Sequence, residues 1–216
     1  MIGIFGGTFD PVHNGHTHAA LSVAAELGLH SIHMLLSARP GHRAPSHTSN
    51  EHRWKMLQLA CADHDNLMAD DRELQRPGTS YTFDTLAAMA AEKSSANEDK
   101  SHPVWILGQD SYATITSWYR WHEITNLCNL VVLDRPGQLT SEAHNLVDFF
   151  AQRQCKKIDH SKAGQMLRLA LPMQEVSATF VRQQLSLGQS VSDHLAPQVS
   201  QYIKQHQLYI TTESIV

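Results

Sequence analysis

Several features that mark other protein classes are scarce in this chain of 216 residues. It has three cysteines, an odd number without a CxxC pair, which favours reduced thiols in the cytoplasm over a disulfide framework. No apolar run approaches the length of a membrane span, and no basic, cleavable leader precedes the first apolar segment. We therefore expect a cytoplasmic protein that does not bind a membrane.

Positive charge is also scarce. The chain has 17 lysine and arginine residues against 21 aspartates and glutamates, for a formal net charge of −4. Because broad nucleic-acid binding needs basic patches, we expect no nucleic-acid partner, although a local cluster can still hold one small anion. The first apolar run is not followed by a GxGxxG fingerprint, and this disfavours a nicotinamide-cofactor dehydrogenase.

What the chain does have is a regular alternation of strand-like and helix-like segments. Apolar runs typical of buried strands are Ile2–Phe5, Ile32–Leu36, Asn66–Ala69, Val104–Leu107, Leu127–Leu133 and Leu167–Leu171. Helical patterns cover Asn14–Leu27, Asn50–Ala62, Thr82–Glu92, Ser141–Gln154, Ser177–Leu187 and Pro197–His206. The alternation predicts an α/β fold: a Rossmann-like, doubly wound, mostly parallel sheet with helices on both faces. The length predicts a single domain over residues 1–216.

The segment Gly6–His16, GGTFDPVHNGH, lies between the first predicted strand and the first predicted helix. Its two leading glycines permit a tight turn and a close approach of the backbone to a ligand. The helix N-terminus that follows, with its unpaired N–H groups, is a favourable place for a phosphate. A plain strand-to-helix turn is the alternative that this segment by itself leaves open.

Two histidines, His13 and His16, are spaced three residues apart at the start of that helix and point to the same side of its first turn. Without a nearby set of cysteines or carboxylates they are a weak signal for a metal, so we predict no metal site made of side chains. Beside a phosphate, they can hydrogen-bond oxygens whose charge grows during phosphate transfer. Two polar residues at a helix terminus, without such a role, are the alternative.

A second helix start lies near the other end of the chain, in the segment VSATFVR, residues 176–182. Ser177 is a good N-cap, and Thr179 and Arg182 lie three residues apart on one helical face. Hydroxyls and a guanidinium at a helix start suit a polyphosphate. A capped surface helix with a solvated arginine gives the same pattern.

Together, GGTFDPVHNGH and VSATFVR resemble the two signatures of the nucleotidyltransferases that carry a T-x-G-H-like motif. More narrowly, the chain resembles the bacterial nicotinate-nucleotide adenylyltransferases, since further segments match that family in order. These are Pro40–Arg43, Arg53 with Met56-Leu57, Ser80–Thr82 with Thr85-Leu86, Gly108–Ser111, Trp118-Tyr119 and Arg135–Gly137.

The resemblance implies that ATP and nicotinate mononucleotide give deamido-NAD and pyrophosphate in NAD biosynthesis, with Mg²⁺ bound mainly through the ATP phosphates. It implies a monomer or small homo-oligomer whose C-terminal helices, about 177–207, complete the ATP site. The catalytic residues that it implies are His13, His16 and Arg182. The ATP-binding residues are Gly6, Gly7, Thr8, Phe9, Gly15, Gly108, Asp110, Ser177, Thr179 and Arg182. The residues for the second substrate are His42, Arg43, Thr82, Thr85, Trp118, Tyr119 and Arg135.

The chain departs from the family pattern in two places. The stretch Ser37–Pro40 stands where the family usually has an asparagine-containing, proline-rich loop, and Arg39 adds a charge that we expect to assist phosphate binding. Ala178 replaces the usual second serine of the VSATFVR signature, which removes one hydroxyl and predicts a modest effect.

Three other functions stay open at this point. Two are adenylyltransferases of the same superfamily, for nicotinamide mononucleotide or for pantetheine phosphate. The pantetheine type is shorter and lacks the GQDS and Trp-Tyr set. The third is a non-catalytic nucleotide-binding protein on this fold, which is disfavoured because binding alone does not require both His13 and His16.

Overall fold

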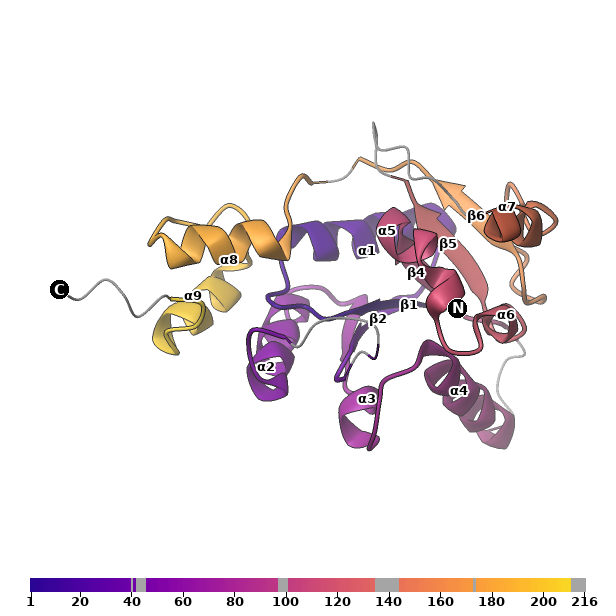
Figure 1. Ribbon diagram of the computed structural model, residues 1–216, viewed down its shortest axis with the longest axis horizontal. Coiled ribbons are helices and arrows are strands. Elements are labelled where there is room, and N and C mark those ends of the chain that lie inside the picture. Colours follow the sequence, from indigo (N-terminus) through magenta and orange to yellow (C-terminus); the bar gives the residue numbers. More distant parts are fainter. Residues whose placement is uncertain (40, 42–45, 97–100, 135–143, 173, 211–216) are drawn as a thin grey trace.

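The computed structural model describes residues 1–39, 41, 46–96, 101–134, 144–172 and 174–210 (Figure 1). Its strands are β1 (Ile2–Gly7), β2 (Ser31–Leu36), β3 (Leu67–Asp70), β4 (Val104–Gly108), β5 (Asn129–Leu133) and β6 (Met166–Leu169). They form one sheet in the order β3-β2-β1-β4-β5-β6, in which each neighbouring pair is parallel. The predicted α/β, doubly wound fold is confirmed, and the topological switch point lies between β1 and β4.

The longer helices connect these strands and extend the chain beyond β6. They are α1 (Asn14–Leu27), α2 (Asn50–Cys61), α4 (Thr82–Ala96), α7 (His144–Ala151), α8 (Ala178–Ser186) and α9 (Pro197–Gln205). The predicted range of α1 is confirmed at both ends. Its C-terminus is set by Gly28, whose left-handed φ of 61° lets the N–H of the cap reach carbonyls of the last turn.

Four short elements were not expected from the sequence. They are the helices α3 (Arg72–Gln75), α5 (Gln109–Ala113) and α6 (Trp121–Ile124) and the 3₁₀ turn η1 (Ile115–Ser117). None completes two helical turns, so apolar periodicity has no length over which to become visible. All four lie between β3 and β5, and this part of the chain supplies one side of the cleft described below.

The sheet separates two apolar cores. One contains Val23 of α1, Met56 of α2 and Val199 of α9, and the other contains Leu86 of α4 and Phe150 of α7. Each of these side chains is buried. Helices therefore cover both faces of the sheet, as predicted, and strand residues are buried on both sides.

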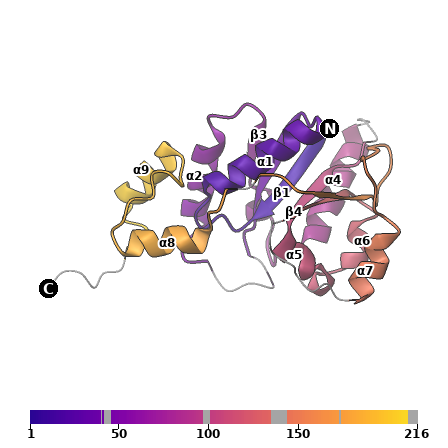
Figure 2. The same cartoon turned by 90° about the horizontal axis from the view of Figure 1, so that it is seen from above.

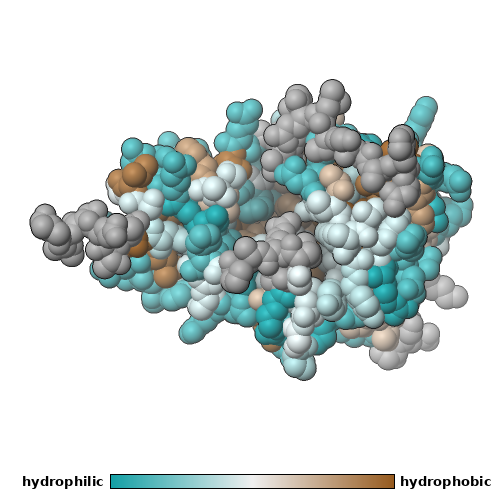
Figure 3. All heavy atoms as spheres, viewed as in Figure 1, coloured by the Kyte–Doolittle hydropathy of each residue, from teal (hydrophilic) through white to brown (hydrophobic). Residues whose placement is uncertain are grey.

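The C-terminal helices lie at one end of the molecule, beside α2, while α6 and α7 lie at the other end (Figures 1 and 2). The surface in Figure 3 is mostly hydrophilic, and some of its apolar spheres lie at the end occupied by α8 and α9. Phe180 and Leu187 are exposed in this region. Within the described ranges, none of the helices combines the length and the apolar character needed to cross a bilayer.

Candidate functional site

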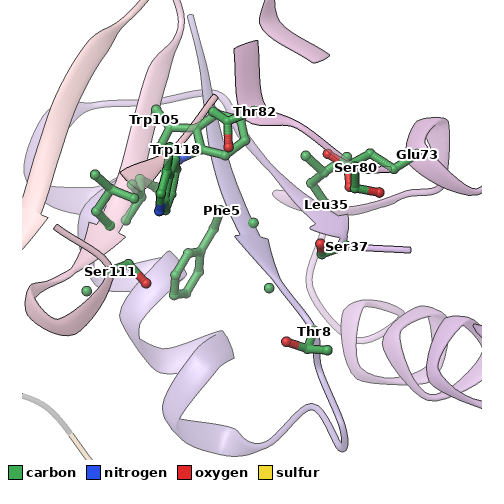
Figure 4. A pocket seen from close by; sticks show the side chains of 15 residues that line it. Phe5, Thr8, Leu35, Ser37, Glu73, Ser80, Thr82, Trp105, Ser111 and Trp118 are labelled. Carbon is green, nitrogen blue, oxygen red and sulfur yellow. The ribbon is translucent and has the colours of Figure 1, made fainter. Parts of the chain in front are cut away.

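An open cleft lies at the carboxyl ends of the central strands (Figure 4). Residues 5–8 at the end of β1, residues 105–108 of β4, and Leu35 and Ser37 around the end of β2 line it. Glu73, Ser80, Thr82, Ser111 and Trp118 complete the lining. The cleft therefore lies at the switch point of the sheet, where ligands bind in folds of this class.

The turn after β1 differs from the one expected. Gly6 and Gly7 belong to the strand itself, in register with Leu35 and Leu36 of β2. The predicted glycine turn is thus corrected: the chain reverses just after the glycines, where Phe9 has a φ of 49° and the peptide bond before Pro11 is cis. Gly7 leaves room for the buried Phe9 ring, because a Cβ on Gly7 would meet that ring at 2.8 Å.

His13 and His16 lie face to face at the start of α1, with ring centroids 3.6 Å apart and an angle of 24° between the ring planes. The N–H of His13 donates to Nδ1 of His16 at 3.2 Å. A neutral His16 ring therefore carries its proton on Nε2, which can donate to a ligand oxygen. The Phe9 ring packs edge-on against His16 at a centroid distance of 5.0 Å and helps to fix its orientation.

The N-terminus of α1 is less open than expected. His13 is the N-cap, and the N–H of His16 donates to its carbonyl at 2.8 Å. The N–H of Asn14 donates to the carbonyl of His194 at 2.8 Å. The expectation of unpaired N–H groups is therefore wrong for these two residues, because the cap and the segment before α9 already use them.

Gly15 has a packing reason as well as its predicted role in ATP binding. A Cβ at this position would come within 2.8 Å of Cγ1 of Val176. The absence of a side chain lets the segment before α8 approach the start of α1. Glycine here thus brings the two signature segments together.

Arg182 of α8 links the same two segments directly. Its Nη1 donates to the carbonyl of Asp10 at 2.7 Å, and its Nη2 donates to Oγ1 of Thr179 at 3.2 Å. Ser177 is the N-cap of α8, as predicted, and its Oγ accepts from the N–H of Phe180 at 3.1 Å. The guanidinium therefore reaches the β1–α1 turn across 172 residues of sequence.

Asp10 is a junction that sequence reasoning missed. Its carboxylate, only 5% exposed, accepts from the N–H of His47 at 2.5 Å, from Oγ1 of Thr48 at 2.9 Å and from the hydroxyl of Tyr209 at 2.7 Å. Burial raises the pKa of the Tyr209 hydroxyl above its ordinary value, so this group stays a donor. The Asp10 carboxylate therefore joins two distant segments, residues 47–48 and Tyr209, to the turn that follows β1.

Arg53 of α2 is completely buried and supports two loops from behind. Its Nη1 donates to the carbonyl of Thr8 at 2.6 Å and to that of Ser37 at 2.9 Å, and its Nη2 donates to the carbonyl of Ala38 at 3.2 Å. Burial lowers the pKa of the guanidinium, while the charge of Asp10 acts in the opposite direction. A sequence signal existed, because Arg53 lies three and four residues before the core residues Met56 and Leu57.

On the opposite side of the cleft, Thr82 and Trp118 line the space. Tyr119 is 48% exposed and packs against the ring of Tyr81 at a centroid distance of 4.7 Å. Trp105, which belongs to the predicted buried strand Val104–Leu107, is only 4% exposed and also lines the cleft.

Thr85 lies behind this wall rather than in the cleft. It is fully buried, its Oγ1 donates to Oε1 of Glu73 at 2.9 Å, and it accepts from Nη2 of Arg76 at 3.1 Å. The expected contact between Thr85 and a substrate is therefore corrected. The structure gives Thr85 a supporting position beneath Glu73.

Arg39 also differs from expectation. Its guanidinium donates to the carbonyls of Glu73 at 3.2 Å and Gly78 at 2.6 Å, and to that of Arg76. The expected help in phosphate binding is corrected, because these carbonyls engage the guanidinium. It holds the 73–78 segment against the end of β2.

Of the remaining expected residues, Gly108 lines the cleft and Asp110 is exposed in the first turn of α5. His42, Arg43 and Arg135 lie outside the described residues. In the part of the chain that the structure describes, no three His, Cys, Asp or Glu side chains gather as a metal site would require.

Comparisons with known proteins show the family to which the chain belongs. A family model described as cytidylyltransferase-like matches residues 4–184. A probable nicotinate-nucleotide adenylyltransferase of Pectobacterium atrosepticum is 35% identical over 214 residues, covering 97% of this chain and 98% of the relative. A protein of the same name from Pseudomonas aeruginosa is 37% identical over 210 residues, covering 96% of each chain.

Solved structures give the same fold. Plasmodium falciparum nicotinic acid mononucleotide adenylyltransferase, in complexes with APC and with NaAD, superposes with a TM-score of 0.70. The identity is 17%, and 96% of each chain is covered. At this identity the likeness carries the fold alone.

Proposed function

The chain belongs to the cytidylyltransferase-like family and, within it, to the nicotinate-nucleotide adenylyltransferases, and from this premise we propose how its cleft performs the reaction. ATP and nicotinate mononucleotide give deamido-NAD and pyrophosphate. The observation that carries the proposal is the position of the cleft. On one side of the cleft lies the turn after β1, which we call the phosphate turn and which precedes the stacked pair His13 and His16. On the other side lie Thr82 and Trp118.

The reaction is an in-line displacement at phosphorus. A phosphate oxygen of the mononucleotide forms a bond to the α-phosphorus of ATP, and the bond from that phosphorus to the bridging oxygen of pyrophosphate breaks. No general base is needed, because the attacking phosphate, with a second pKa of about 6, is already ionised at neutral pH. The protein contributes positioning and charge stabilisation, without a covalent intermediate.

His16 stabilises the charge that develops at the α-phosphate through its Nε2–H group, with His13 stacked beside it. Arg182 holds the far end of the triphosphate, and Ser177 and Thr179 lie with it in the first turn of α8. Residues 177–207 complete the ATP site of a single domain over 1–216. The bond from Arg182 to Asp10 supports this arrangement, since it joins α8 to the phosphate turn.

The pyridine nucleotide occupies the side of Thr82 and Trp118, where the indole face stacks on the ring. The backbone at Tyr119 and the Thr82 hydroxyl are the donors that we assign to the carboxylate of the ring. His42, Arg43 and Arg135 are assigned to the phosphate of this substrate by the family pattern alone.

Mg²⁺ bound mainly through the phosphate oxygens of ATP would neutralise part of the triphosphate charge. The hard oxygen donors that it prefers are those of the nucleotide, so we assign it no protein side chain. The enzyme works in the cytoplasm as a monomer or small homo-oligomer, on two small nucleotides and without a nucleic-acid partner.

Release of pyrophosphate from ATP tests this function, with nicotinate mononucleotide, nicotinamide mononucleotide and pantetheine phosphate as alternative acceptors. We expect kcat/KM at least about tenfold higher with nicotinate than with nicotinamide mononucleotide, because the amide leaves donors for the carboxylate unpaired. Equal rates with the two pyridine nucleotides would refute the pocket assignment. If pyrophosphate were released with pantetheine phosphate and with neither pyridine nucleotide, nicotinate mononucleotide would be refuted as the substrate.

A further inference from the structure

Glu73 carries a carboxylate that the reaction described above does not use. Among the described residues that line the cleft, it is the only one with an ionisable side chain. It is 4% exposed and projects from α3 toward the cleft, close to Ser80 and Leu35 (Figure 4). A buried charge at a substrate cleft requires partners that compensate its loss of hydration.

Only half of this carboxylate is satisfied. Oε1 accepts from Oγ1 of Thr85 at 2.9 Å, and that hydroxyl in turn accepts from Nη2 of Arg76 at 3.1 Å. Oε2 is buried and has no hydrogen-bond partner within the described part of the chain. An acceptor left in this state is costly unless a ligand brings a donor.

The backbone around Glu73 is fixed before any ligand arrives. Arg39 donates to the carbonyl of Glu73 at 3.2 Å and to the carbonyl of Gly78 at 2.6 Å. The N–H of Arg39 donates to Oγ of Ser80 at 3.2 Å, and the N–H of Ser80 returns a bond to the carbonyl of Arg39 at 2.9 Å. The carboxylate is therefore held on a rigid frame, which suits recognition of one particular group.

The chemistry of nicotinate mononucleotide limits what Oε2 can accept from it. The phosphate and the ring carboxylate are anionic acceptors, and the substituted ring nitrogen carries no hydrogen. The ribose hydroxyls are the donors of this molecule at neutral pH. Acidic side chains bind ribose hydroxyls in the same way in dinucleotide-binding folds.

We propose that Oε2 of Glu73 accepts a hydrogen bond from a ribose hydroxyl of the mononucleotide substrate and so sets the position of its phosphate for attack. This proposal rests on the proposed function. Glu73 lies on the same side of the cleft as Ser80 and Thr82, away from the turn that faces ATP (Figure 4). Its effect therefore concerns the mononucleotide and not ATP.

The test crosses two enzymes with three substrates. Wild type and Glu73→Gln are assayed with nicotinate mononucleotide and with its 2′-deoxy and 3′-deoxy analogues, and kcat and KM are determined separately. We expect wild type to prefer the natural substrate over one of the analogues by about tenfold in kcat/KM, the usual size of a lost hydrogen bond to a charged group. Glu73→Gln should lose most of this preference, with KM for ATP changed less than about twofold.

Two further variants distinguish a direct contact between Glu73 and the substrate from a purely structural role of Glu73. Glu26→Gln removes an exposed carboxylate from α1 and should keep the preference of wild type. Glu73→Asp keeps the charge but withdraws it by one methylene, and should also lose the preference. Thermal unfolding of each variant shows whether the protein is folded. If Glu73→Gln does not fold, Glu73→Asp is compared with wild type in its place.

Equal losses with all three mononucleotides would overturn the proposal, because a purely structural role does not distinguish the hydroxyls. A wild-type enzyme that uses the natural substrate and both analogues equally well would overturn it as well. Absence of any turnover with nicotinate mononucleotide by folded wild type would instead overturn the proposed function, so the two failures are distinguishable.

Discussion

The two sides of the cleft are held together in different ways. On the phosphate side, formed by Gly6–His16 and Ser177–Arg182, buried polar groups fix the backbone of the turn after β1: Arg53 donates to the carbonyl of Thr8, and the Asp10 carboxylate accepts from the hydroxyl of Tyr209. On the mononucleotide side, formed by residues 73–82 and 108–119, much of the lining is side-chain surface, including Trp118. Exposed Tyr119 lies next to it.

This difference matches the two tasks of an adenylyl transfer. Stabilising charge at a phosphorus atom needs donors that do not move during the reaction, and a backbone held by buried arginine provides them. Choosing one mononucleotide over another depends on the shape and the hydrogen-bonding groups of side chains. Changes on the phosphate side should therefore alter stability or turnover, whereas changes on the mononucleotide side should alter KM for one substrate.

The largest effect should follow replacement of Arg53, which supports the phosphate side from below. Arg53→Met leaves three main-chain carbonyls without this donor, and we expect the free energy of unfolding to fall by about 3 kcal/mol or more. Urea denaturation measures this change. Lys55→Met, at an exposed position of the same helix, is the matched control and should stay within about 0.5 kcal/mol of wild type.

His16→Ala should lower turnover about 10²-fold or more while ATP still binds, because the lost donor acts on charge that appears only in the transition state. Single-turnover kinetics and ATP binding by calorimetry measure the two effects separately. His64→Ala, a histidine that does not line the cleft, should leave both unchanged. An unaltered rate for His16→Ala would remove His16 from the mechanism.

Trp118→Ala should raise KM for the mononucleotide about tenfold, since stacking of an aromatic base on an aromatic side chain contributes about 1–3 kcal/mol. KM for ATP should change little, and Trp118→Phe should recover part of the loss. Tyr119→Phe keeps both the ring and the backbone and should change KM less than about twofold. If KM for ATP rose as much as KM for the mononucleotide, the division into two sides would be wrong.

The smallest effect should come from Thr179, which accepts a bond from Arg182 at 3.2 Å and is itself exposed. Thr179→Val should change kcat/KM for ATP by less than about threefold, if its hydroxyl only positions the arginine. Thr179→Ser is the control that keeps the hydroxyl. A tenfold loss in Thr179→Val that Thr179→Ser restores would instead place this hydroxyl on the triphosphate.

Sequence reasoning succeeded where the pattern was local and long. The helix Asn14–Leu27 was predicted with the observed limits, because its apolar face and the glycine after it are both visible in the sequence. The strand predicted to begin at Leu127 begins at Asn129, which is a boundary error within one element. The parallel sheet followed from the order of these elements.

The errors have a common cause. Arg39 and Thr85 have the right chemistry for ligand binding, but the structure engages one with carbonyls of the 73–78 segment and the other with Glu73 and Arg76. Glu73 itself lies in a helix of four residues, too short to leave a periodic signal. Whether a polar side chain faces a ligand or another part of the protein depends on segments distant in sequence.

The sequence by itself determined the class of fold, because the order and periodicity of its segments are displayed completely in one chain. Its two signature segments, and the further segments that match in order, identified the resemblance to the nicotinate-nucleotide adenylyltransferases and the substrates that this resemblance implies. The tertiary structure decided which donors at α1 are already used, that Arg53 and Asp10 hold the phosphate side together, and that Glu73 faces the cleft with one oxygen unpaired among the described residues. Burial and long-range hydrogen bonds set these properties, and both arise only when the chain is folded.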